Sequence, residues 1–120
     1  MTPINIQRQC AHSPDAFKRR ATERLSVLRG IGPGKVRDLN AVWDARVLKC
    51  DVTGRGPYER DLGILGKPSG LILVQAILYL TRDGRAVLSG AVTARGDWES
   101  KAEAETLTRL EALMNELVSN

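Results

Sequence analysis

The residues with the clearest chemical potential form a short glycine-rich turn with cations directly behind it. Gly30, Gly32 and Gly34 alternate along this turn, and Lys35 and Arg37 follow. Glycine permits positive φ and lets an anion approach the backbone closely. Free amides at the start of a following helix favour a phosphate, and neighbouring cations add attraction. The turn therefore predicts a phosphate-binding site, for which we expect nine residues to contribute: Lys18, Arg19, Arg20, Arg29, Gly30, Gly32, Gly34, Lys35 and Arg37.

The surrounding stretch, residues 25–39, resembles the helix-hairpin-helix motif of non-specific DNA-binding proteins. The resemblance lies in the pattern Leu25-x-x-Leu28-x-Gly30-Ile31-Gly32-x-x-x-Val36-x-x-Leu39. It implies that the hairpin amides bind a backbone phosphate of nucleic acid, with DNA favoured over RNA, a contact that does not specify sequence. Val36 departs from the pattern, because the family has a small residue there. The alternative is a plain connection in which Gly30 ends one helix and Pro33 starts the next.

Charge is divided unevenly between the two parts of the chain. Residues 1–50 hold ten Lys or Arg and four Asp or Glu, whereas residues 51–120 hold eight and ten. The first part therefore carries an excess of six positive charges within a formal net charge of +4. Two arrangements account for this asymmetry. Either the basic half faces a polyanion, or its cations form a solvated helix face beside an acidic helix of the same protein.

Three elements are expected before residue 46. Ile4 and Ile6 alternate with polar residues, which indicates a short edge strand. Ser13-Pro14-Asp15 is typical of a helix start, since serine caps free amides and proline suits the first turn. A second short helix is expected from Lys35 to about Trp43, so that residues 13–43 form a helical hairpin.

The second part of the chain is typical of a β-meander. Residues 46–53 predict a strand, and Gly54–Gly70, with five glycines and two prolines, predicts a long loop. Leu71–Leu80 is an apolar run without alternation, which indicates a central strand covered by helices or by a second subunit. An Asp-Gly turn then leads into a return strand, Ala86–Ala94.

The last element is expected to be a helix ending near Val118. Ser100-Lys101-Ala102-Glu103 fits a capping box, and the helix carries an apolar stripe that should pack on the sheet. The order of strands and final helix is similar to the end of a double-stranded-RNA-binding domain. Glu99, Glu103 and Glu105 stand where that family needs cations, so this likeness implies element order and not function.

These elements combine into an α+β fold. We expect a single domain over residues 1–120, with a helical hairpin at 13–43 and a β-meander plus helix at 46–118. The sheet should have three to four antiparallel strands, with the C-terminal helix packed on it. Hydrophobic residues make up 42% of the chain and charged residues 27%, which is ordinary globular usage.

Nothing in the sequence indicates an enzyme or a cofactor. Cys10 and Cys50 lie far apart and His12 is the only histidine, so no spacing suits a metal. The N-terminus has no signal-peptide pattern, and the longest apolar run is well short of the roughly 20 residues that span a bilayer. We therefore expect a cytoplasmic protein with free thiols and no membrane partner.

Two functions agree with these features. The first is a small non-enzymatic nucleic-acid-binding accessory protein that contacts the phosphate backbone through the basic hairpin. The second is a protein–protein interaction module, such as a subunit of a bacterial or phage assembly or a secretion-chaperone-like dimer. In that second case the partner or second copy would bind through Leu71–Leu80 and the C-terminal helix.

Overall fold

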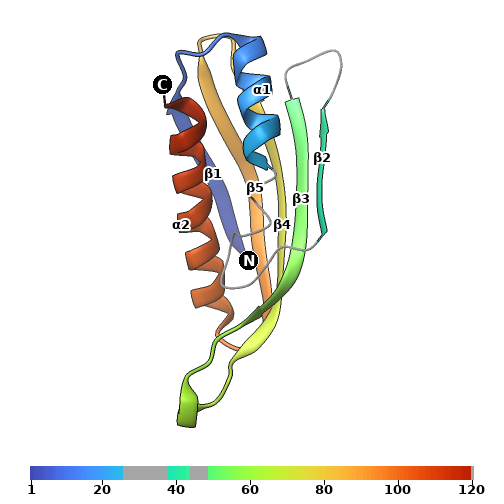
Figure 1. Cartoon of the computed structure of the whole chain (residues 1–120), viewed down its shortest axis with the longest axis vertical. Helices are drawn as coiled ribbons and strands as arrows, with labels where there is room; N and C mark the ends of the chain where they lie inside the picture. Colours follow the sequence, from blue (N-terminus) through green and yellow to red (C-terminus); the bar gives the residue numbers. More distant parts are fainter. Residues whose placement is uncertain (26–37, 44–48, 120) are drawn as a thin grey trace.

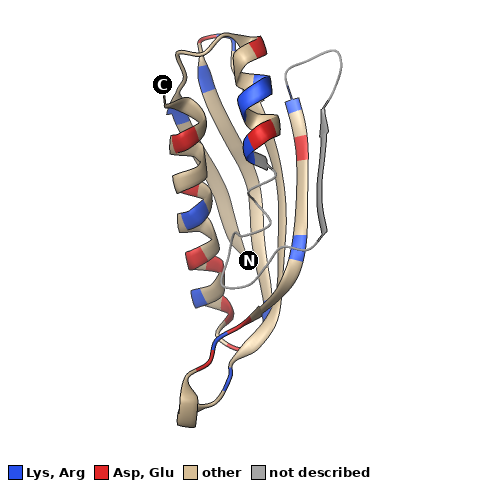
Figure 2. Ribbon diagram, viewed as in Figure 1, with Lys and Arg blue, Asp and Glu red and all other residues tan. Residues whose placement is uncertain are grey.

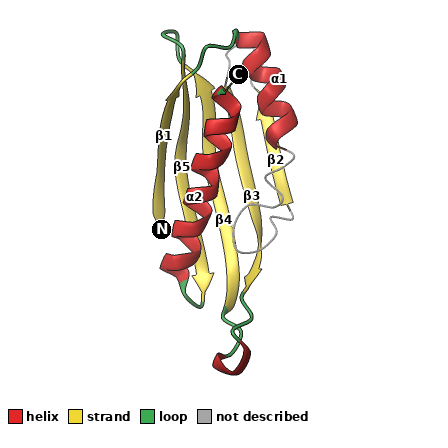
Figure 3. Cartoon of the chain, turned by 60° about the vertical axis from the view of Figure 1, so that its left-hand side comes forward, coloured by secondary structure: helices red, strands yellow, loops and turns green. Residues whose placement is uncertain are grey.

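Five antiparallel strands form one sheet, and two helices lie on one of its faces (Figures 1 and 3). The computed structural model describes residues 1–25, 38–43 and 49–119. Strands β2 to β5 follow one another as a meander, and β1 pairs with β5, which gives the order β1-β5-β4-β3-β2. The elements are β1 (Thr2–Gln9), α1 (Pro14–Leu25), β2 (Asp38–Trp43), β3 (Lys49–Glu59), β4 (Ser69–Leu80), β5 (Arg85–Gly96) and α2 (Glu99–Val118).

The core lies between the sheet and α2. In β4 every second residue is buried, from Ile72 through Val74 and Ala76 to Leu78, because alternate side chains of a strand point to one face. On α2 the buried leucines and methionine recur at helical spacing, as Leu110, Leu113, Met114 and Leu117. The α+β class and the C-terminal helix on the sheet are therefore confirmed.

Helix α1 begins where its capping residues predict. The Ser13 hydroxyl accepts a hydrogen bond from the Ala16 N–H at 3.3 Å, and the Ser13 carbonyl accepts from the Phe17 N–H at 2.8 Å. Phe17 and Ala21 are fully buried in the core, one turn apart on the same helix face. Sequence reasoning thus places the start of α1 correctly.

Glu103 joins three elements at the start of α2. Its carboxylate is 4% exposed and accepts hydrogen bonds from the Thr2 hydroxyl at 2.7 Å and the Ala94 N–H at 2.9 Å. The Met1 amine lies 3.2 Å from the same carboxylate. Burial alone would raise the pKa of Glu103, but these hydrogen bonds outweigh it and the pKa lies below its ordinary value. Glu103 therefore ties β1 and β5 to α2 and is not the capping-box residue that its spacing predicts.

The predicted N-terminal helical hairpin is not present as expected. Only α1 is helical in the described N-terminal part, and residues 38–43 form β2, not the end of a second helix. Strand β2 pairs with β3 over its whole length, with Leu39 opposite Gly54 and Trp43 opposite Cys50. Pairing with a distant strand overrides a short local pattern, because strand formation depends on its neighbours. The added strand makes the sheet five-stranded instead of three- to four-stranded.

The predicted long loop Gly54–Gly70 is shorter than expected, because both of its ends are strand. β3 continues to Glu59 and β4 begins at Ser69, so only residues 60–68 connect them. Gly54, Gly56 and Tyr58 continue the alternating buried pattern of β3, so these glycines stand at inward strand positions rather than in a loop. Residues 63–65 form one turn of 3-10 helix within this connection. The result is a long β3–β4 hairpin whose end extends past the rest of the molecule (Figures 1 and 3).

Candidate functional site

The predicted basic residues of α1 do not share one role. Lys18 and Arg19 are exposed, whereas Arg20 is half-buried and faces the end of α2. Arg20 donates to the carbonyls of Leu117 at 3.3 Å and Glu116 at 2.8 Å, which are among the last carbonyls of α2. A cation at that position satisfies terminal carbonyls and the helix dipole. Arg20 is therefore a structural residue of the α1–α2 contact.

The charges of the two helices are mixed and not gathered into a basic patch. Arg24 pairs with Glu116 at 3.7 Å, so α1 contributes a second cation to the acidic end of α2. Figure 2 shows basic and acidic residues interspersed along both helices. The other six predicted residues lie outside the described residues: Arg29, Gly30, Gly32, Gly34, Lys35 and Arg37.

The central strand is apolar on both faces, as the sequence predicts, but the described helices cover only one. We call the face opposite α1 and α2 the outer face. On this face of β4, Leu71 is 62% exposed and Leu73 is 36% exposed. Because β4 is the middle strand of the sheet, these leucines lie between β3 and β5 and not on an edge strand.

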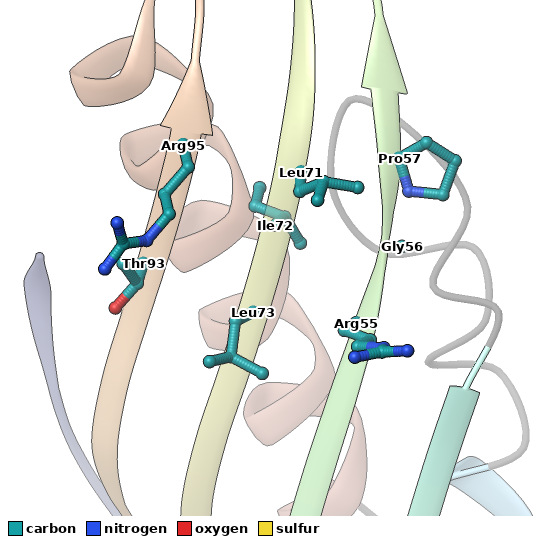
Figure 4. A pocket seen from close by; sticks show the side chains of 8 residues that line it. All are labelled: Arg55, Gly56, Pro57, Leu71, Ile72, Leu73, Thr93 and Arg95. Atoms are coloured by element: carbon teal, nitrogen blue, oxygen red, sulfur yellow. The ribbon is translucent and has the colours of Figure 1, made fainter.

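The two leucines form the floor of a groove across three strands. In the antiparallel register Leu71 lies between Pro57 and Arg95, and Leu73 lies between Arg55 and Thr93. The hollow over these residues has a volume of about 560 Å³ and is shown in Figure 4. We call it the groove and define it by its six outward residues: Arg55, Pro57, Leu71, Leu73, Thr93 and Arg95.

Two arginines stand at the sides of the groove. Arg55 on β3 and Arg95 on β5 lie on either side of the leucines, and the described residues that line the groove include neither Asp nor Glu (Figure 4). Asp38 of β2 lies directly opposite Arg55 in the strand register. A guanidinium can donate several hydrogen bonds to a carboxylate while its aliphatic stem covers apolar surface. The groove therefore suits an occupant that combines apolar and anionic groups.

The histidine, the two cysteines and Tyr58 are buried or held in structural contacts. The His12 ring Nε2 lies 2.9 Å from the Ser119 carbonyl, and both cysteines are buried thiols. Tyr58 is buried and donates its hydroxyl to the Asp97 carbonyl at 2.6 Å; burial, followed by nearby Glu99, raises its pKa. Within residues 1–25, 38–43 and 49–119, no cluster of His, Cys, Asp and Glu could hold a metal ion.

Sequence reasoning expected Leu71–Leu80 to be covered by helices or by a second subunit and named it as a possible partner surface, but it did not identify the groove or the arginines beside it. The signal that could have found it is the alternation Arg55-x-Pro57, Leu71-x-Leu73 and Thr93-x-Arg95. This pattern indicates a groove only when the register of the three strands is known. No described helix has the length and apolar composition needed to cross a membrane. Comparison with family models, curated proteins and solved structures finds no match for this chain.

Proposed function

We propose that this chain is a non-enzymatic protein-interaction module whose partner binds the groove on the outer face. The observation that carries the proposal is the exposure of Leu71 and Leu73 in the middle of the sheet. An apolar surface at the centre of a sheet, with cations at its sides, has the arrangement of an interface core and polar rim. Arg95 would then favour a partner segment that carries a carboxylate.

The energy available at the groove suits a reversible interaction. The exposed fractions of Leu71 and Leu73 together amount to about one whole leucine. Burial of one leucine side chain contributes roughly 1.5–3 kcal/mol, which corresponds to about a tenfold to hundredfold gain in affinity. Specific binding therefore requires the arginines as well as the leucines.

A protein partner fits this face better than a single-stranded nucleic acid. Surfaces that bind single strands stack bases on aromatic rings. Among the described residues that point outward from β1, β3, β4 and β5, Tyr79 is the only aromatic one, and it is half-buried.

The proposal is tested by photo-crosslinking in cells that express the protein. A photoreactive residue is placed at Leu71 in the groove and, as a matched control, at Thr108, which is exposed on α2. The proposal predicts discrete adducts from Leu71 that are absent from Thr108. Loss of the Leu71 adduct in an Arg95→Glu background would link it to the groove. Equal labelling from both positions, or none from Leu71, contradicts the proposal.

A second candidate is phosphate-backbone binding by the basic N-terminal residues. It is favoured by the excess of six positive charges within residues 1–50. It predicts that fluorescence anisotropy with labelled DNA shows binding that weakens steeply with salt. The double substitution Gly32→Ala and Lys35→Glu should abolish this binding and leave the fold intact. If Lys35→Glu retains full affinity, the hairpin hypothesis is wrong.

A further inference from the structure

Strand β1 has one side without a partner strand. It pairs with β5 along its whole length and forms one edge of the sheet, and in Figure 3 no described strand or helix lies beyond it. β1 has eight residues, whereas proteins often keep exposed edge strands very short. Backbone groups on such an edge are free to pair with another strand. We call the side of β1 that faces away from β5 the open edge.

The hydrogen bonds of the ladder show which backbone groups of β1 face the open edge. The Cys10 N–H donates to the Gly84 carbonyl at 2.8 Å, which continues the β1–β5 register by one position. Because bonded and non-bonded positions alternate in an antiparallel pair, the residues that bond to β5 are Thr2, Ile4, Ile6 and Arg8. The residues whose backbone groups face the open edge are therefore Pro3, Asn5, Gln7 and Gln9.

The open edge lacks one donor and has one carbonyl already occupied. Pro3 has no N–H, which suits a position that does not bond to β5. The Arg8 guanidinium donates to the Gln7 carbonyl at 2.8 Å and to the Asn115 side chain of α2 at 2.8 Å. No described residue accepts from the N–H of Asn5 or Gln7. A strand that fits this edge must therefore accept from Asn5 and Gln7 and must lack an N–H opposite Gln7.

A second copy of β1 meets these conditions. When two copies run antiparallel about a two-fold axis at Asn5, Pro3 of one copy lies opposite Gln7 of the other. The residue that cannot donate then faces the carbonyl that Arg8 already satisfies. Asn5 of each copy donates to the Asn5 carbonyl of the other, and Gln7 donates to the Pro3 carbonyl. The backbone groups that face the open edge from Pro3 to Gln7 thus all have partners.

The side chains also match in this register. Ile4 and Ile6 are both buried on the helix-covered face, and each lies opposite the other across the axis. Asn5 is exposed and meets Asn5 of the other copy. Arg8 is the only charged residue of β1 and lies opposite Thr2, so no like charges of the two strands face each other.

We propose that two copies of this chain associate through the open edge, in the register centred on Asn5, so that their sheets join into one. The contact is isologous, since each copy supplies the same strand. This inference goes beyond the proposed function, because the groove lies on β3, β4 and β5 and not on β1. A two-fold axis perpendicular to the sheet keeps the grooves of both copies on the same side of the joined sheet.

The association is tested by sedimentation velocity of the full chain over a micromolar concentration series. The wild type should dimerise, and Asn5→Pro should weaken the dimer by about tenfold or more, because it removes a donor that faces the open edge and not β5. Asn5→Thr keeps the backbone N–H and is the matched control, which should leave the dimer unchanged. Circular dichroism and thermal unfolding establish that both variants are folded. A monomeric wild type overturns the inference, as does a dimer that survives Asn5→Pro.

Disulfide formation tests the register without the use of proline. Opposite residues of a hydrogen-bonded antiparallel pair have Cα atoms about 5.5 Å apart, which a disulfide can span. Asn5→Cys should therefore crosslink two copies under mild oxidation, whereas Gln7→Cys, which faces Pro3 of the other copy, should not. The native Cys10 and Cys50 are buried and should contribute little background. Equal crosslinking yields from the two variants overturn the register centred on Asn5.

A groove variant separates this inference from the proposed function. Leu71→Asp changes the groove on β4 and should leave the dimer through β1 unchanged. A dimer that is lost in Leu71→Asp but survives Asn5→Pro would place the second copy in the groove. That result overturns association through the open edge and supports the proposed function.

Discussion

Leu73 of β4 lies directly opposite Arg55 of β3 in the antiparallel ladder, and both residues are on the outer face of the sheet. An exposed leucine beside an arginine at the centre of a sheet is not needed for folding, because the core lies on the opposite face. Exposed apolar groups grouped in this way mark an interaction surface. The account of function follows from this pair and from the matching pair Leu71 and Arg95.

Charge reversal at Arg95 should remove binding without affecting stability. Arg95 is exposed at the side of the groove, so Arg95→Glu should change the free energy of unfolding by no more than about 0.5 kcal/mol. Binding at the groove should weaken because the partner's carboxylates then meet a like charge. Lys49→Glu, at the other end of the outer face, is the control and should leave binding intact. Urea unfolding and the crosslinking yield from Leu71 measure the two effects separately.

Removal of the Glu103 charge should destabilise the fold. In Glu103→Gln the amide oxygen can still accept from the Ala94 N–H and the NH₂ can donate to the Thr2 hydroxyl, but the negative charge that pairs with the Met1 amine is lost. We expect a loss of about 1–3 kcal/mol in the free energy of unfolding, because a carboxylate accepts stronger hydrogen bonds than a neutral amide and the NH₂ then faces the Met1 amine. Glu111→Gln, exposed on the same helix, should be nearly neutral. Equal urea midpoints for the two variants would contradict the role assigned to Glu103.

The contribution of Glu103 should also depend on pH. Its pKa in the folded state lies below the ordinary value of 4.5, so the unfolded chain binds the proton first as the pH falls. The stabilisation is therefore present above 4.5 and is lost as the pH falls through that value toward the folded pKa. The difference between the unfolding free energies of wild type and Glu103→Gln should shrink in acid. The assignment is contradicted if the difference in unfolding free energy between wild type and Glu103→Gln stays constant from neutral pH to pH 3, about one and a half units below the ordinary pKa.

Arg20 and Arg19 are neighbours in sequence but should behave differently. Arg20→Ala removes two hydrogen bonds to the final carbonyls of α2 and should cost about 1–2 kcal/mol of stability. Arg19→Ala changes an exposed residue and should be nearly neutral for stability. Thermal unfolding of both variants distinguishes the structural cation from the solvent-exposed one. A neutral Arg20→Ala would show that the α2 carbonyls find other partners.

The elements predicted correctly are those whose sequence signals lie in residues close together along the chain. The Ser13 cap, the apolar run in β4 and the Asp-Gly turn before β5 each depend on residues close in sequence, and each prediction is confirmed. The stripe of α2 was equally clear, because its buried residues recur at helical spacing. These signals were sufficient for the α+β class and for the packing of α2 on the sheet.

The features that were missed depend on pairing between distant segments. Leu39 and Val42 have helical spacing, yet they lie in a strand because β3 supplies hydrogen-bonding partners for β2. Gly54 and Gly56 were interpreted as loop residues, although they stand at inward positions of β3. The groove likewise exists only because the register sets Arg55, Leu73 and Thr93 in one row. Register is a property of the whole sheet and is not visible in any one segment.

The measurement that tests the central claim most directly is thiol labelling of Leu71→Cys. The native Cys10 and Cys50 are buried and should react slowly, so a new thiol in the groove reports its own accessibility. Labelling is compared between dilute purified protein and intact cells, with Thr108→Cys on α2 as the control. The account predicts that Leu71→Cys is protected in cells and reactive when dilute, whereas Thr108→Cys reacts equally in both. Equal reactivity of Leu71→Cys in cells and in dilute solution would contradict an occupied groove.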